Sequence, residues 1–160
     1  MGDGVGERCM ALIRSSLTYA IFQLCRSTDI DPLTCEGLPD TIRQRIARET
    51  KLLDSLLLVL RRPHLLGYTL SDLQHPRMQS FVHVLKLAFR CLVVAFEGSR
   101  RSELYLATQR LDSWQPNTGP NSSGTILSEV VRQLDVDVGA ASCLTSLIAD
   151  NALLLEQVSE

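Results

Sequence analysis

Phe89 to Ala107 read FRCLVVAFEGSRRSELYLA, a stretch whose residue pattern indicates helical structure. It begins as a largely apolar run that ends at Phe96. Gly98 is a natural left-handed terminator of a helix, and Ser99 is a natural N-cap for a helix that follows. The stretch therefore predicts an apolar helix, a tight joint and a second helix.

The SRRS segment within this stretch, residues 99–102, has three interpretations. Arg100 and Arg101 at a helix N-terminus could cradle a phosphate. Ser102 follows two arginines and could be phosphorylated, because a phosphate near that N-terminus favours the helix electrostatically. In the third interpretation the segment is a joint, and its arginines point to water. We favour the joint, because capping explains every residue type there, and we keep Ser102 as a candidate phosphorylation site.

The composition indicates one ordinary domain. The chain has 160 residues, of which 45% are hydrophobic and 21% are charged, so it can bury one proper core. The formal net charge is -2, and no global basic field exists to attract a polyanion. We therefore expect a single helical domain, residues 1–160, that does not bind nucleic acid.

The cysteines and the apolar runs indicate in which cellular compartment the chain is found and whether it enters a membrane. The five cysteines are Cys9, Cys25, Cys35, Cys91 and Cys143, with no C-x-x-C pair, which favours a reducing environment. MGDGVGE lacks the basic region of a signal peptide and misses the myristoylation pattern. The longest apolar run, Val84 to Phe96, is broken by two basic residues and is shorter than the about 20 residues that a membrane span needs. We expect no direct membrane insertion.

Apolar spacing is helical nearly everywhere, without a convincing strand pattern. A first helix is predicted from about Glu7 to Ser27. A second is predicted from an N-cap at Asp40 to Arg62, stopped by Pro63 because proline supplies no backbone donor. The stripe of the first helix is Ile13, Leu17, Ile21 and Leu24, and the shared face of the second is Ile42, Ile46, Leu53, Leu56, Leu57 and Leu60.

After a connector at residues 64–75, Pro76 is well placed in the first turn of a third helix. This helix is apolar on most sides, so we expect it to be central. Its narrow polar stripe consists of Gln79, His83, Lys86, Arg90 and Glu97.

The fourth predicted helix carries Leu104, Ala107, Leu111 and Trp114 on one face, and an exposed loop, residues 115–124, follows it. Three short helices are predicted beyond the loop, around Leu127–Leu134, Ala141–Ile148 and Leu154–Val158. The expected fold is an all-α, armadillo-like stack or bundle of about six to seven helices.

No residue set in the sequence points to catalysis. His64, His75 and His83 have no metal-ligand spacing, and we assign them surface or capping roles. The G-x-S-x-G, P-loop and H-E-x-x-H signatures are absent. The acidic pair in DVDV, residues 135–138, lacks the further oxygens of an EF-hand. We therefore expect no enzyme activity, no metal and no cofactor.

From Val84 onward, the order of segments resembles a known family. An apolar helix with FRCL is followed by RRSELYLA, by a glycine-containing loop and by GAASCLTSLIADNALLLEQ. This order is similar to the RIH domain, the homology region that ryanodine receptors and inositol trisphosphate receptors share. In that family a similar helix precedes a basic-Asn-Gln-x-Tyr-aliphatic start and, later, an A-x-x-x-aliphatic-T-x-L-L-x-x-N segment that ends in L-L-E.

The matching positions fall in two motifs. The first comprises Arg101, Tyr105 and Leu106, with Ser102 and Glu103 in place of the family's Asn and Gln. The second comprises Ala140, Leu144, Thr145, Leu147, Ile148, Asn151, Leu154, Leu155 and Glu156, whereas Ala152 and Leu153 replace a frequent basic pair. KLLDSLLLVLRRPHL also resembles the family's preceding helix. The resemblance covers roughly residues 46–159 and leaves residues 1–40, an N-terminal helix and linker, unmatched.

The resemblance implies an armadillo-like array on the cytosolic side of a calcium-release channel of the endoplasmic reticulum. Such a region acts as a lever between the ligand-binding portion and the pore, and its partners are other channel domains or subunits. The chain itself contains no pore helices, so we expect either a fragment of a larger receptor or a stand-alone copy.

The alternative is a cytoplasmic adaptor whose apolar helix faces bind a partner helix. The N-W-G-R signature of groove-type apoptosis regulators is absent.

Overall fold

The computed structural model describes residues 3–27, 30–108 and 139–140. In this part of the chain there are six α-helices, one short 3-10 helix and no strand. The elements are α1 (Asp3–Cys25), α2 (Thr41–Glu49), α3 (Leu52–Leu65), α4 (Leu70–Gln74), η1 (Pro76–Met78), α5 (Gln79–Phe96) and α6 (Arg100–Thr108). The predicted all-α bundle is confirmed.

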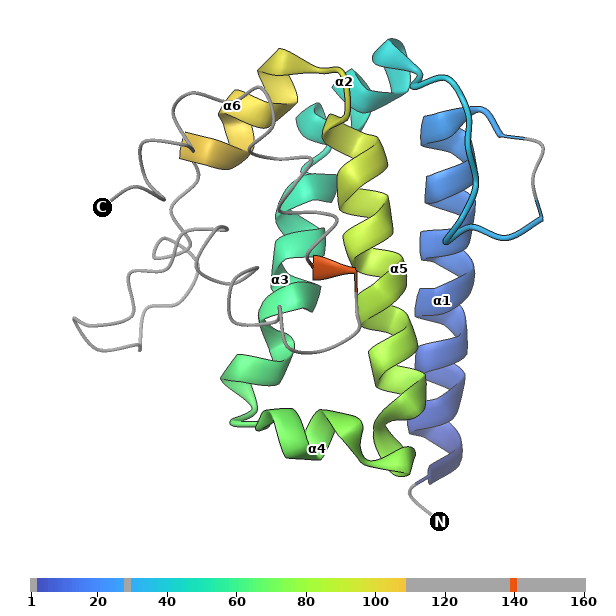
Figure 1. Cartoon of the computed structure of the whole chain (residues 1–160), viewed down its shortest axis with the longest axis vertical. Helices are drawn as coiled ribbons and strands as arrows, with labels where there is room; N and C mark the ends of the chain where they lie inside the picture. The colour runs from blue at the N-terminus through green and yellow to red at the C-terminus, as the bar shows by residue number, and fades with distance from the viewer. Residues whose placement is uncertain (1–2, 28–29, 109–138, 141–160) are drawn as a thin grey trace.

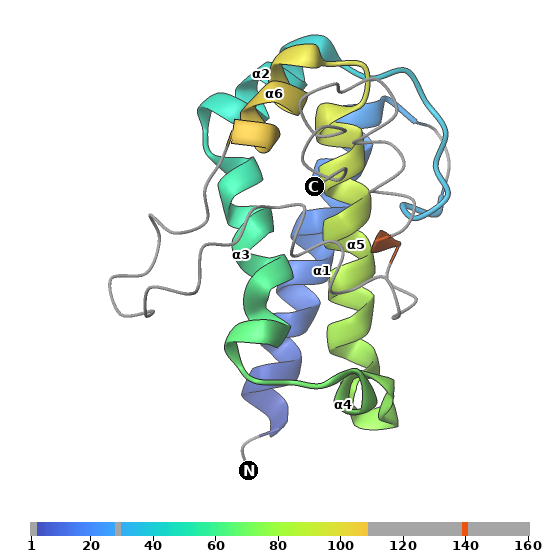
Figure 2. The ribbon, with the colours of Figure 1, turned by 60° about the vertical axis from the view of Figure 1, so that its left-hand side comes forward.

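Three long helices form the body of the bundle (Figure 1). α1, α3 and α5 run side by side, and α5 contacts both of the others. α1 and α5 point in the same direction, whereas α3 runs the opposite way. α2 and α6 lie over one end of the body, and α4 lies at the other end (Figure 2). The short helices therefore close the two ends of a three-helix core.

The core is centred on α5, as its apolar composition predicts. Val84, Leu85 and Leu87–Phe89 are buried, and so is the whole run from Cys91 to Phe96. Ile21 and Leu24 of α1 pack with them in one apolar cluster, together with the leucines of α3. Burying one such large side chain contributes about 1.5–3 kcal/mol. Packing between helices therefore contributes far more than the propensities of the individual helices.

The segment Pro76–Phe96 meets the length and composition criteria of a membrane span, with a mean hydropathy of 1.5 in its most apolar window. This segment is longer than the apolar run Val84 to Phe96, because η1 and α5 form one continuous stretch. The expectation of no direct membrane insertion stays a prediction. In the structure 61% of that window is buried within the bundle. The buried core helix of a globular domain has the same composition, so these criteria alone do not assign a span.

The predicted single helix from Asp40 to Arg62 is wrong. α2 ends at Glu49, and Lys51 has a left-handed backbone with a φ of 61°. This residue changes the direction of the chain, so the two halves do not share one face. Ile42 and Ile46 are exposed. The buried residues of α2 are instead Gln44 and Ala47.

The predicted stop at Pro63 is also wrong, because α3 continues to Leu65. Pro63 lies in the last turn, where a proline removes only one hydrogen bond of the helix. Gly67, with a φ of 71°, provides the left-handed termination instead. The expected connector contains α4, which starts at a capping box of Thr69 and Asp72.

Other predicted boundaries are confirmed. Asp40 is the N-cap of α2, since its carboxylate accepts from the N–H groups of Ile42 and Arg43, each at 3.1 Å. Gly98 has a φ of 69°, and the hydroxyl of Ser99 accepts from the N–H of Ser102 at 3.4 Å. The loop at residues 115–124, the later helices, and Leu111 and Trp114 lie outside the described residues.

Candidate functional site

A cluster of polar side chains joins four helices at the end of the bundle that α6 covers. We refer to it as the α6 cluster, and it comprises Gln44 and Arg48 of α2, Asp54 of α3, and Ser102 and Tyr105 of α6. The backbone of α5 takes part through its last carbonyl groups. Within the described residues, these side chains connect α2, α3, α5 and α6 by hydrogen bonds, so we take the cluster as the candidate functional site.

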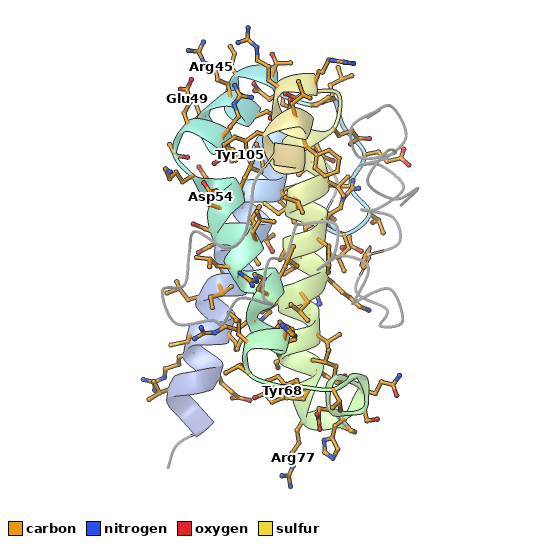
Figure 3. The ribbon with its side chains drawn as sticks, turned by 90° about the vertical axis from the view of Figure 1, so that its left-hand side faces the viewer. Arg45, Glu49, Asp54, Tyr68, Arg77 and Tyr105 are labelled. Atoms are coloured by element: carbon orange, nitrogen blue, oxygen red, sulfur yellow. The ribbon has the colours of Figure 1, made fainter. Side chains whose placement is uncertain are left out.

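Tyr105 of α6 and Asp54 of α3 lie next to each other (Figure 3). The Tyr105 hydroxyl donates to Asp54, at 3.0 Å from Oδ1 and 2.8 Å from Oδ2. Asp54 is buried, with only 4% of its surface exposed to solvent. It lies in the first turn of α3, where the helix N-terminus favours a negative charge. A buried carboxylate is costly unless it accepts hydrogen bonds. The bond from Tyr105 therefore stabilises Asp54 and attaches α6 to α3.

Ser102 fixes the N-terminal turn of α6 to α2. Its hydroxyl accepts from Arg48 Nη1 at 3.2 Å and from the Ser99 hydroxyl at 3.1 Å. Ser102 is fully buried, whereas Arg100 and Arg101 are exposed. This arrangement agrees with the joint interpretation of SRRS. Phosphorylation of Ser102 stays a prediction, and it requires the start of α6 to move away from α2.

Gln44 connects α2 to the C-terminus of α5. Its Nε2 donates to the carbonyl oxygens of Val94, at 3.0 Å, and Glu97, at 2.8 Å. The last carbonyl groups of a helix have no partner within the helix. A buried glutamine that binds two of them therefore fixes the rotation of α2, and it explains why Ile42 and Ile46 face outwards.

A second group of polar contacts lies where the chain passes from α1 to α2. Arg26 Nε lies 2.7 Å from Asp40 Oδ2, and Arg43 Nε lies 3.5 Å from the same oxygen. The backbone N–H of Arg43 and the side chain of Arg26 hold the pKa of the Asp40 carboxyl below its usual value. Since Asp40 caps α2, these contacts set where α2 begins.

A cleft with a volume of about 530 Å³ lies between α1, α4 and α5, away from the α6 cluster. It is open to solvent. Among the described residues its lining contains no carboxylate, and the lining residues are Arg14, Leu73, Gln74, Gln79, Ser80, Val82, His83 and Lys86. The cleft can accept a polar or anionic group, but it brings together none of the predicted site residues.

The histidines occupy the surface. His75 Nδ1 accepts from the N–H of Arg77 at 3.2 Å, which is a capping role, and His64 and His83 are exposed. In residues 3–27, 30–108 and 139–140, no three His, Cys, Asp or Glu side chains lie close enough to hold a metal ion. The DVDV segment lies outside this part of the chain.

The first motif of the resemblance maps onto α6. Arg101 is exposed, Tyr105 is half-buried in the α6 cluster, and Leu106 lies in the same helix. Ala140, from the second motif, is buried. The other second-motif positions, Leu144, Thr145, Leu147, Ile148, Asn151, Leu154, Leu155 and Glu156, lie outside the described residues.

Sequence reasoning missed Gln44, Arg48 and Asp54. Their partners lie about fifty residues further along the chain, and helical periodicity cannot reveal such pairs. One signal was present for Asp54, since it is the single acid in the apolar run LLDSLLLVL. A charge in the middle of such a run requires a buried partner.

No protein-family model matches the chain, and no curated protein matches it. The class of protein therefore rests on the fold alone, which is an all-α bundle with polar contacts between the helices at one end.

Proposed function

We propose that the chain is a helical coupling module of the ryanodine and inositol trisphosphate receptor type. It transmits conformational change on the cytosolic side of a calcium-release channel, and it catalyses no reaction. The observation that carries the proposal is the contact of Tyr105 with Asp54. The tyrosine is the most distinctive residue of the first motif, and it is also the residue that anchors α6 to the core.

The α6 cluster suits a coupling role for a physical reason. Apolar contacts are non-directional, whereas hydrogen bonds between buried groups hold one geometry and are costly to leave unmade. A displacement of α6 acts on α2 through Ser102 and on α3 through Tyr105. A motion that enters at α6 therefore reaches two other helices through defined bonds.

A free helical adaptor is the second candidate. The observation that favours it is the outward position of Ile42 and Ile46, which lie one turn apart on α2 and are 68% and 51% exposed. Apolar residues at this spacing are typical of a face that binds a partner helix.

Cross-linking in cells, combined with calcium-release measurements, tests the proposal. The endogenous protein is tagged and cross-linked, and the linked peptides are identified by mass spectrometry. We expect links from residues 100–105 to channel sequence, in the same chain or in a companion chain. We also expect Tyr105→Phe to shift the agonist concentration for half-maximal release several-fold, because it weakens the docking of α6.

Tyr68→Phe is the matched control, since Tyr68 lies at the opposite end of the bundle (Figure 3). It removes the same hydroxyl from an exposed tyrosine and should leave calcium release unchanged. Links to a soluble helical partner alone, with calcium release unaffected by Tyr105→Phe, would reject the coupling role and support the adaptor.

A further inference from the structure

Two buried thiols face each other where α1 ends. Cys25 is the last residue of α1, and Cys35 lies in the segment of residues 30–40 that leads into α2. Their Sγ atoms are 3.2 Å apart, and the residues are 4% and 0% exposed. The Cys35 thiol is also within 3.5 Å of the Pro32 carbonyl oxygen. The two sulfurs therefore form a hydrogen-bonded pair, shielded from water.

Contacts that do not involve sulfur hold the two backbones together on one side of the pair. The N–H of Asp40 donates to the Leu24 carbonyl at 2.9 Å, and Arg26 pairs with the Asp40 carboxylate. The end of the segment is thus attached to the last turn of α1. This attachment would persist if either sulfur were removed.

Further contacts fix the segment beside the sulfurs. Gly37 lies directly on the Cys25 carbonyl, so close that a Cβ there would be 2.0 Å from the oxygen. A guanidinium nitrogen of Arg90 in α5 donates to the Cys35 carbonyl. The position of Cys35 against α1 is therefore set by backbone packing, and the nearness of the thiols is a stable property of the fold.

We propose that Cys25 and Cys35 are a redox-active dithiol that closes to an intrachain disulfide with a small disulfide oxidant, such as oxidised glutathione. A disulfide bond measures about 2.0 Å, so each sulfur moves by less than about 1 Å. Closure attaches residues 30–40 covalently to α1. It thereby stiffens the start of α2, which follows Asp40 directly.

The reaction proceeds in two exchanges. Cys35 releases its proton, and its thiolate attacks one sulfur of oxidised glutathione; a mixed disulfide forms, and one glutathione thiolate leaves and is protonated. Cys25 then releases its proton and attacks the Cys35 sulfur, which expels the second glutathione in the same way. Two protein thiols are oxidised, and one oxidised glutathione is reduced to two thiols.

The reduced pair reacts slowly while it stays buried. Burial, followed by the hydrogen bond with Cys35, raises the pKa of the Cys25 thiol to about 11. Since the thiolate is the nucleophile, closure needs residues 30–40 to move away from α1 for a short time. The pair therefore stays reduced in a reducing compartment and closes under sustained oxidation.

The test uses the purified full chain, incubated with oxidised glutathione, then denatured and alkylated. We expect a peptide map in which Cys25 and Cys35 are linked with the loss of two hydrogens and carry no alkyl group, and a Tm higher by about 5–10 °C. We also expect slower amide hydrogen exchange in residues 30–49, with no change in α4. Free, alkylated Cys25 and Cys35 in protein whose exposed Cys9 has reacted would overturn the proposal. Unchanged exchange in residues 30–49 would overturn the stiffening.

Cys35→Ala and Cys25→Ala should each abolish the loss of two hydrogens and the rise in Tm. The matched control is Cys9→Ala, which removes an exposed thiol of α1 and should leave the disulfide unchanged. Linkage of Cys25 to another cysteine in the Cys9→Ala protein would refute the pairing. The map of the unmodified sequence decides the question even if a variant of a buried cysteine does not fold.

Discussion

Replacing Tyr105 by phenylalanine removes one hydroxyl from the α6 cluster and leaves the ring in place. That hydroxyl donates to both carboxylate oxygens of Asp54, at 3.0 and 2.8 Å. Asp54 is 4% exposed, so water cannot fully replace the lost donor. The substitution therefore removes the hydroxyl through which α6 binds Asp54 of α3.

The size of the effect follows from the charge and burial of the acceptor. A hydrogen bond to a charged group contributes about 1.5–3 kcal/mol, and an acceptor left unsatisfied in the interior costs a similar amount. Tyr105 is half-buried, so some water reaches the vacated position. We expect a loss of about 2 kcal/mol in the free energy of unfolding, which lowers the Tm by roughly 4–8 °C for a domain of this size.

Urea unfolding, followed by circular dichroism, measures the loss. Tyr68→Phe is the control, since Tyr68 is 41% exposed and its ring lies edge-on to Phe81 with centroids 6.2 Å apart. It should change the free energy by less than about 0.5 kcal/mol. Asp54→Asn completes a double-mutant cycle, and we expect a coupling of at least about 1 kcal/mol with Tyr105→Phe. Equal effects of the two tyrosine substitutions, or no coupling in the cycle, would show that the bond between Tyr105 and Asp54 does not stabilise the fold.

Three further predictions concern the backbone and the pH dependence of stability. Folding lowers the pKa of Asp40, so its contribution is complete above its unfolded pKa, about 4, and is lost as the pH falls through the lower folded pKa. The Asp40→Asn variant should therefore be less stable than the natural sequence at pH 7 and should converge with it at low pH, in urea midpoints measured across that range. Lys51→Gly should raise stability by roughly 0.5–1 kcal/mol in thermal unfolding, because glycine accepts the left-handed φ of 61°; a loss of about 1 kcal/mol would indicate a continuous helix there. Gly37→Ala should lower the free energy of unfolding by about 4–5 kcal/mol, which is near the limit for single substitutions, because its Cβ would clash with the Cys25 carbonyl. Gly6→Ala, in open space on α1, should instead gain about 0.5–1 kcal/mol.

The elements that the sequence predicts well are those whose signals are local. α5 is apolar on most sides, and its burial follows from that composition alone. Gly98, Ser99 and Asp40 act within three residues of their own positions, so the cap residues identify them. The class of fold was predictable for the same reason, because helical periodicity needs no knowledge of distant partners.

The errors arise where a distant contact overrides a local pattern. Ile42 and Ile46 continue the apolar spacing of α3, yet Gln44 faces inwards because the carbonyls of Val94 and Glu97 need a donor. Lys51 has no intrinsic preference for a left-handed backbone, so the break between α2 and α3 had no sequence signal. Tyr105 was identified from a motif, but its partner Asp54 is 51 residues away. Tertiary structure alone could supply that pairing.

α2 lies between the α6 cluster and the segment that carries Cys35, and coupling between these two sites can be measured. Its N-cap, Asp40, holds the segment that carries Cys35, and its Arg48 holds Ser102 in the α6 cluster. If closure of the disulfide stabilises the docking of α6 through α2, linkage requires that docking of α6 favours closure by the same factor.

Tyr105→Phe, which weakens that docking, should therefore make the Cys25–Cys35 disulfide easier to reduce. Equilibration in glutathione buffers of graded ratio gives the reduction midpoint for the natural sequence and the variant, with Tyr68→Phe as the control. A midpoint that moves several-fold in Tyr105→Phe alone shows coupling through α2. Identical midpoints in all three proteins would show that α2 does not couple the dithiol to the α6 cluster, because any coupling must change both equilibria.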